Sequence, residues 1–380
     1  MRQKGGGSEA KYTIKVYCGN NPEIKLGNYT ALDFIYQGAL AFKNYCENNS
    51  DNQIAVDIYS SGQLGSTQEA TQQAMQGTLE CVMSGDGELS TLYPDLQTMS
   101  IPYLFDNRAQ FYAMQDSNYM ESVALDIENK LGLITLAASD NGGFRNFSNN
   151  VKPIHSAADM KNLKIRTMES PIYSAMLESF GASATPISYS EMYSALQTGV
   201  VDGQENSPGT TLNAGIYEVN KYYVLDGHSI ASIFLMMNKN YFENLPDDLQ
   251  SVVVEAGKTA QYAMRGANCA NEALALEALA EKGMEVYAPT AEEKETFRVC
   301  QEPVIEWLKG QIGEETVTQF MSAVETVKAG EDTDVSQTVQ AASTNTGSMN
   351  TITYAACLVA VFAVLFGAWT LKKDDKKKKE

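Results

Sequence analysis

Hydrophobic and polar residues near the start of the chain follow two patterns that together predict a β–α–β unit. The segments Tyr12–Cys18 and Ile54–Tyr59 are rich in β-branched and aromatic residues, which favours strands. Between them, the stretch TALDFIYQGALAFKNYCEN has apolar residues at the spacing of an amphipathic helix. A helix that joins two strands in this way predicts a parallel sheet.

Start and stop signals for a helix follow directly. Ser66 with Glu69 three residues later is typical of a capping box, and Gly77 suits the end of that helix. The apolar run Leu79–Met83 then predicts the next strand.

The same order of signals returns in the second half of the chain. Ser188 with Glu191 predicts a helix start, Gly199 its end, and Val200–Val201 the beginning of a strand. Two α/β units built alike in one chain of 380 residues indicate two lobes of related topology.

The region after the second unit is expected to be helical. A long helix should begin at Pro246–Asp248 and reach about Lys282, a length of about 50 Å at 1.5 Å per residue. Further helices are predicted at Ala291–Gln311 and Glu314–Ala329.

The last part of the chain has the pattern of a membrane anchor. Thr351–Leu371 contains 21 residues without a charge, and a lysine-rich tail follows it. A buried globular helix is the alternative, but the run is apolar on every face, which favours a transmembrane helix with the tail in the cytoplasm. The preceding residues 331–350 are predicted to be a flexible stalk, and the glycine-rich residues 1–10 a disordered linker.

Composition and motifs exclude several classes of function. The formal net charge of −19 disfavours binding to nucleic acid phosphates. The chain has no GxSxG motif, phosphate loop or dinucleotide fingerprint, and its histidines, His155 and His228, lack the spacing of metal ligands. We therefore expect no enzyme activity, no cofactor and no metal. Cys18 and Cys81 lie in neighbouring strand-like runs, so they either pair or, as we prefer, remain buried free thiols.

Two arginines in strand-like runs point to a different chemistry. Arg145 in GGFRNFSNN and Arg166 in LKIRTM each carry a planar fork of donors that pairs with both oxygens of a carboxylate. Together with the side-chain amide of Asn206 in GQEN, they suggest a pocket for a small carboxylate. Surface ion pairs are the alternative on spacing alone.

Longer phrases resemble the solute receptors of tripartite ATP-independent periplasmic (TRAP) transporters. The resemblance covers roughly residues 11 to 325, and seven phrases agree in order and spacing. The phrases are IYSSGQLGSTQEATQQAMQGTLE (58–80), IPYLF (101–105), GFRNFSN (143–149), DMKNLKIRTMES (159–170), GASATPISYSEMYSALQTGVVDGQEN (181–206), YEVNKYYVLDGH (217–228) and LPDDLQSVVVEA (245–256).

The resemblance implies roles for individual residues. Arg166 stands where the family pairs an arginine with the ligand carboxylate, and Arg145 matches a second arginine that supports or contacts the ligand. Asn206 matches an amide that orients the carboxylate, although a turn residue is the alternative. Tyr189 stands where the family usually has phenylalanine and is expected to line the pocket, with an ordinary core position as the alternative.

One acidic residue is added to this set from its position. Asp86 belongs to the segment Ser84–Glu88, which follows a strand of the first lobe and should face the cleft. An acidic group there would bind an amine or hydroxyl of the ligand. Relatives that hold a metal place Glu–Trp after the matching strand of the second lobe; here Asn206 follows Glu205, so no metal is expected.

The predicted fold class is therefore α/β, a two-lobed periplasmic-binding-protein-like fold of type II with a long brace helix and one C-terminal transmembrane helix. The expected organisation is as follows: linker 1–10; lobe I, 11–142 and 231–270; lobe II, 143–230 and 271–330; stalk 331–350; transmembrane helix 351–371; basic tail 372–380.

The resemblance also implies a function. The protein is expected to be an extracytoplasmic receptor, in the periplasm or on the outer face of the cell membrane. It would clamp an organic acid between its lobes and deliver it to the membrane subunits of an ion-gradient-driven TRAP permease. The alternative is a membrane-tethered sensor that presents a bound carboxylate to a signalling partner.

Overall fold

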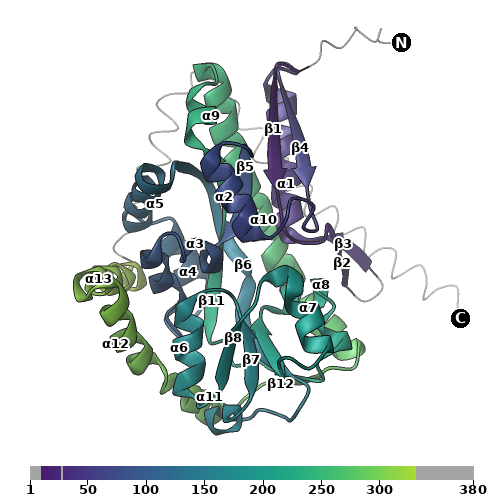
Figure 1. Cartoon of the computed structure of the whole chain (residues 1–380), viewed down its shortest axis with the longest axis vertical. Coiled ribbons are helices and arrows are strands. Elements are labelled where there is room, and N and C mark those ends of the chain that lie inside the picture. The colour runs from purple at the N-terminus through teal and green to yellow at the C-terminus, as the bar shows by residue number, and fades with distance from the viewer. Residues whose placement is uncertain (1–9, 27–28, 331–380) are drawn as a thin grey trace, which may run out of the picture. The chain divides into compact units, whose positions relative to one another are not determined.

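A computed structural model describes residues 10–26 and 29–330, which belong to one compact unit. Its centre is a mixed β-sheet with the strand order β4-β1-β5-β11-β6-β9-β7-β8 (Figure 1). Along this path the strands are β4 (Ile54–Tyr59), β1 (Tyr12–Tyr17), β5 (Cys81–Gly85), β11 (Ser229–Asn238), β6 (Leu133–Asn149), β9 (Gly203–Asn206), β7 (Lys164–Thr167) and β8 (Ser183–Pro186). Two further strands of the same sheet lie off this path, β10 (Tyr222–Val224) and β12 (Glu285–Tyr287). The strands β2 (Glu23–Leu26) and β3 (Tyr29–Leu32) form a separate hairpin.

The predicted parallel unit is confirmed. Strand β1 pairs in parallel with β4 and with β5, and the helix α1 (Phe34–Asn49) connects β1 to β4. At the opposite end of the strand order, β7 pairs in parallel with β8 and β9. Two parallel regions therefore flank a central antiparallel pair.

That central pair, β6 and β11, joins the two parallel regions. The strands run antiparallel from Leu133 opposite Asn238 to Arg145 opposite Ser229, and β6 then pairs with β9 and β10. Gly142 and Gly143 have φ of 87° and 104° in the middle of β6, a conformation that side chains other than glycine rarely adopt. The predicted boundary between the lobes at residues 142 and 143 therefore lies inside a continuous strand. The division into lobes remains a prediction.

Helices cover the sheet (Figure 1). The longest, α10 (Asp247–Glu281), confirms the predicted long helix. The other α-helices are α2 (Thr67–Gln76), α3 (Asp86–Leu89), α4 (Arg108–Gln115), α5 (Asn118–Leu131), α6 (Pro171–Ser179), α7 (Tyr189–Gln197), α8 (Pro208–Asn213), α9 (Lys239–Glu243), α11 (Ala291–Arg298), α12 (Gln301–Ile312) and α13 (Glu314–Ala329). Three 3₁₀ helices complete the set: η1 (Pro94–Ser100), η2 (Ala157–Met160) and η3 (Ile216–Glu218).

Local signals located some helix ends correctly and misplaced other elements. The capping box at Ser66 and Glu69 is present, and Gly77 ends α2 in the left-handed conformation. The strand predicted from Val200 begins only at Gly203, since the chain first completes a turn after α7. The single helix predicted over 291–311 is two helices, α11 and α12, separated near Cys300.

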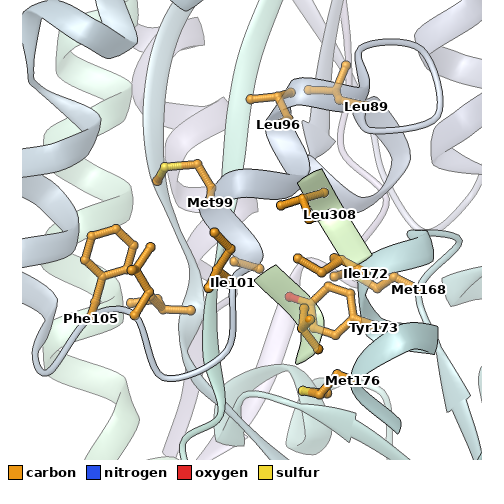
Figure 2. Packing of buried hydrophobic residues seen from close by; sticks show 14 of the residues in the cluster. Leu89, Leu96, Met99, Ile101, Phe105, Met168, Ile172, Tyr173, Met176 and Leu308 are labelled. Atoms are coloured by element: carbon orange, nitrogen blue, oxygen red, sulfur yellow. The ribbon is translucent and has the colours of Figure 1, made fainter. Parts of the chain in front are cut away.

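Two groups of buried side chains hold these layers together. Helix α10 packs against α1 and β6, and a Cβ atom on Gly257 would lie 2.4 Å from the backbone oxygen of Leu136 in β6. A second group joins the segment at the end of η1 to α6 and α12, as Figure 2 shows for Ile101, Ile172 and Leu308. Where α10 approaches β6, the short distance between Gly257 and Leu136 requires a residue without a side chain at position 257.

The transmembrane part of the predicted fold class is wrong. In the part of the chain that the structure describes, no helix is long and apolar enough to cross a membrane. Helix α10 has the length, but it carries charged residues such as Glu255, Lys258 and Arg265 along its length. The predicted span Thr351–Leu371, like the stalk, the tail and residues 1–9, lies outside the described residues. For residues 10–26 and 29–330, the fold class is corrected to the α/β fold without a transmembrane helix.

Candidate functional site

Strands from both parallel regions end around one small cavity, which we call the inner cavity. Its volume is about 40 Å³, enough for a few water molecules. Gly85 ends β5, Asn206 ends β9, Arg166 lies near the end of β7, and Asn141 and Arg145 come from β6. The carboxyl ends of strands in open α/β sheets are the usual place for ligands.

A larger outer cavity continues from the inner one. Its volume is about 230 Å³, and it shares Gly19, Thr67, Glu88 and Tyr189 with the inner cavity. The remaining residues that line it come from the loops before α2 and α7, the starts of these helices and nearby segments. The two cavities together have room for a small organic molecule.

Arg166 is the most unusual side chain of the inner cavity. It is only 2% exposed, and its Nε donates to the backbone oxygen of Ile187 at 2.8 Å. Its Nη1 has no hydrogen-bond partner within the described residues. Burial lowers the pKa of Arg166 to about 10, because the charges nearby do not compensate for the loss of water. A buried cation with a free donor is a ready partner for an anion.

Arg145, by contrast, is already paired. Its Nη2 donates to Oε1 of Glu205 at 2.9 Å and to the backbone oxygen of Glu205 at 2.8 Å, and its Nε donates to Oε2 of the same carboxylate. The guanidinium also lies over the ring of Tyr173, 5.5 Å from its centroid. Arg145 is thus held in place by its own counter-charge.

Glu205 belongs to a buried chain of ionisable groups. Its Oε2 lies 3.2 Å from Nε2 of His228, whose Nδ1 lies 2.8 Å from Oδ2 of Asp226. Burial alone would raise the pKa of Glu205, but Arg145 and His228 outweigh it and lower the pKa to about 2. Burial alone would lower the pKa of His228, but Asp226 and then Glu205 raise it above its ordinary value. Nothing local in the sequence around His228 indicated its partner Glu205, 23 residues away in the chain.

The predicted amide and aromatic residues also line the inner cavity. Asn206 is buried, and its Oδ1 accepts from the backbone N–H of Ser207. Tyr189 begins α7, lines both cavities and donates from its hydroxyl to Oδ1 of Asn213 at 3.2 Å. Arg166, Arg145, Asn206 and Tyr189 are therefore brought together in space, while their roles toward a ligand remain predictions.

Asp86 is placed differently. It is not among the residues that line either cavity; its Oδ2 accepts from the backbone N–H of Ser232 at 3.0 Å and from the hydroxyl of Ser100 at 3.2 Å. Burial raises the pKa of Asp86 to about 7. Glu88, two residues later, lines both cavities instead. The predicted acidic segment thus does reach the site, but through a different carboxylate.

Two remaining features concern the cysteine thiols and the side chains that could bind a metal ion. Cys18 and Cys81 are both buried free thiols. Among residues 10–26 and 29–330, no three His, Cys, Asp or Glu side chains are grouped so that they could hold a metal ion.

The fold is that of a two-lobed α/β solute receptor, and comparisons with known proteins agree. Residues 27–311 match the family of bacterial extracellular solute-binding proteins, family 7. The C4-dicarboxylate-binding periplasmic protein DctP of Rhodobacter capsulatus is 28% identical over 290 residues, 76% of this chain and 86% of that protein.

Two solved structures extend the likeness to the fold. A TRAP periplasmic solute-binding protein from Sulfitobacter sp. NAS-14.1 with bound β-D-galacturonate is 27% identical, with a TM-score of 0.75 over 82% of this chain and 99% of that one. Another, from Sulfurospirillum deleyianum DSM 6946 with bound succinate, is 25% identical, with a TM-score of 0.76 over 83% and 99%. The chain belongs to solute-binding protein family 7, and the predicted family of TRAP receptors is confirmed.

Proposed function

We propose that this protein is the extracytoplasmic receptor of a TRAP transporter and binds a small carboxylate in the inner cavity. The observation that carries the proposal is the Nη1 of Arg166, a buried charged donor without a hydrogen-bond partner among the residues that the structure describes. Leaving such a group unpaired costs several kcal/mol, and a ligand carboxylate would remove that cost.

The neighbouring side chains suit the same ligand. Arg145 is neutralised by Glu205, so it contributes position and hydrogen bonding more than free charge. Asn206 supplies an amide beside the two guanidinium groups, and the ring of Tyr189 forms a wall between the cavities. A carboxylate on Arg166 would then extend its remaining atoms toward the outer cavity.

Membership of the family supports delivery of the ligand to a permease. Relatives named as binding periplasmic proteins carry ligands such as C4-dicarboxylates and ectoine. We propose that this receptor closes around its ligand and hands it to separate membrane subunits that use an ion gradient. The long antiparallel pair β6 and β11, with Gly142 and Gly143 within it, is the segment proposed to bend.

Binding can be tested on the purified protein with a panel of organic acids. A carboxylate that binds the folded state should raise the melting temperature, and calorimetry then gives its affinity. Arg166→Ala should weaken binding at least about tenfold, or ~1.4 kcal/mol, because a charge-assisted bidentate contact is lost. Arg166→Lys should also be impaired, since an ammonium group cannot reproduce the fork.

The matched control is Arg298→Ala. Arg298 is a half-exposed arginine on α11 that lines neither cavity. Its loss should leave the affinity unchanged. Equal affinities for wild type and both Arg166 variants would disprove the site.

A further inference from the structure

The outer cavity has an unusual balance of charge. More than half of the residues that line it carry hydroxyl groups, two carry carboxylates, Glu88 and Glu169, and no Lys, Arg or His is among them. The cation of the site, Arg166, belongs to the inner cavity. A ligand that spans both cavities therefore meets positive charge at one end only.

Glu88 occupies the junction between the two cavities. It follows β5 on the short helix α3, and its Oε2 lies 2.6 Å from the point where a Cβ atom on Gly85 would be. A side chain at position 85 would displace this carboxylate from its present position. The nearest other polar group to that point is Nδ2 of Asn141, at 3.6 Å.

The carboxylate of Glu88 is free to accept hydrogen bonds. Within the described residues it forms no ion pair, and the backbone N–H of Glu88 itself is the group that hydrogen-bonds to it. Burial raises the pKa of Glu88, an effect that this N–H and Arg166 reduce and Glu169 increases. At pH 8 a carboxylate there would repel a second anion and attract a hydrogen-bond donor.

The helix starts beside the outer cavity do not reverse this balance. The N-termini of α2 and α7 carry partial positive charge, which by itself would attract an anion. Each of them, however, has a glutamate in its first turn, Glu69 in α2 and Glu191 in α7, which offsets the helix dipole. The outer cavity thus offers hydroxyls, two amides and carboxylates, and no Lys, Arg or His lines it.

We propose that Glu88 determines specificity by accepting a hydrogen bond from a hydroxyl of the ligand, so that the receptor takes hydroxylated monocarboxylates and rejects dicarboxylates. This inference rests on the proposed function, because Arg166 must hold the single carboxylate. Hydroxyl groups suit the outer cavity because they both donate and accept, as do the Ser, Thr and Tyr side chains that line it. A second carboxylate would face Glu88 and Glu169 without a cation to offset their charge.

The test uses pairs of acids that share a carbon skeleton and differ only at the far end. D-gluconate and D-glucarate, D-galactonate and D-galactarate, and D-erythronate and meso-tartrate each exchange a terminal CH₂OH for a carboxylate. Calorimetry at pH 8 with the full chain should show at least one monocarboxylate binding tenfold or more tightly than its dicarboxylate partner. Glu88→Gln should reduce that ratio to threefold or less, because an amide can donate to a carboxylate.

Glu255→Gln, at a half-exposed glutamate of α10 that lines neither cavity, should keep the wild-type ratio. The inference is overturned if a dicarboxylate binds as tightly as its partner, if Glu88→Gln leaves the ratio unchanged, or if only acids without hydroxyl groups bind. These results still leave the proposed function standing when Arg166→Ala weakens the binding that is seen at least about tenfold. If no carboxylate binds, or if both Arg166 variants bind as tightly as wild type, the proposed function itself fails.

Discussion

The buried pair of Arg145 and Glu205 allows a quantitative prediction about stability. Arg145 is 1% exposed and Glu205 is fully buried, so neither charge is accessible to water. Replacing Glu205 by Gln keeps the shape of the side chain but removes its charge. The guanidinium of Arg145 is then buried without a counter-charge, and the amide group turns a donor toward Arg145 or His228, which are themselves donors.

The expected loss can be worked out from the pKa of Glu205. It falls from the ordinary value of 4.5 to about 2 on folding. At ~1.4 kcal/mol per pKa unit, this shift corresponds to roughly 3 kcal/mol of stability at neutral pH. Breaking a buried pair by removing one partner costs about 3–5 kcal/mol, which agrees.

Urea unfolding at pH 7 of four proteins tests the reasoning: wild type, Glu205→Gln, Arg145→Met and the double variant. Each single variant should lose about 3 kcal/mol, because each removes the bidentate counter-charge of a buried partner. The double variant should be more stable than the sum of the two losses implies, by at least ~2 kcal/mol. Additive losses would show that the two side chains do not stabilise each other.

The dependence on pH provides a second check. Because the folded pKa of Glu205 is depressed, its contribution is fully present above the unfolded value of 4.5 and is lost as pH falls toward about 2. The stability gap between wild type and Glu205→Gln should therefore shrink between pH 5.5 and 2.5. Throughout this pH range His228 stays protonated in the wild type, because the pKa of His228 is raised. A constant gap across the range would contradict the assigned pKa.

Three further results are expected. Gly257→Ala should destabilise the protein by about 1–3 kcal/mol in urea unfolding, because its Cβ would meet the backbone oxygen of Leu136 at 2.4 Å. Gly266→Ala on the same helix has open space at this position and should stabilise by about 0.5–1 kcal/mol, so equal effects of the two substitutions would refute the packing argument. A thiol reagent should label Cys269 rapidly, because it is the exposed cysteine among those described, and Cys269→Ser should remove one fast equivalent; no difference would contradict its exposure. Small-angle scattering with a saturating ligand should show a smaller radius of gyration, and an unchanged value with a ligand known to bind would exclude closure.

Local sequence patterns were sufficient for the elements whose ends depend on neighbouring residues. The capping box of Ser66 and Glu69 and the left-handed Gly77 located α2, because their hydrogen bonds span only a few residues. Strand-like runs on either side of a helix were likewise enough to predict the parallel unit of β1, α1 and β4. These features depend on chemistry within one or two turns of chain.

The site could be predicted only in part. Arg145, Arg166, Asn206 and Tyr189 were singled out from strand ends and from the family resemblance, and the structure brings them to one cavity. Asp86 was chosen where Glu88 lines the cavity, since the side-chain direction after β5 depends on how the short helix α3 turns.

What only the tertiary structure decided is which charges are neutralised. Arg145 and Glu205 lie 60 residues apart, and the antiparallel pairing of β6 with β9 places them in contact. The same pairing, with β11 on the other side of β6, brings His228 to Glu205. Sequence alone could not tell that Arg145 is already paired while Nη1 of Arg166 is free. The reason is that a charge is satisfied by neighbours in space, and strand order, not spacing along the chain, chooses those neighbours.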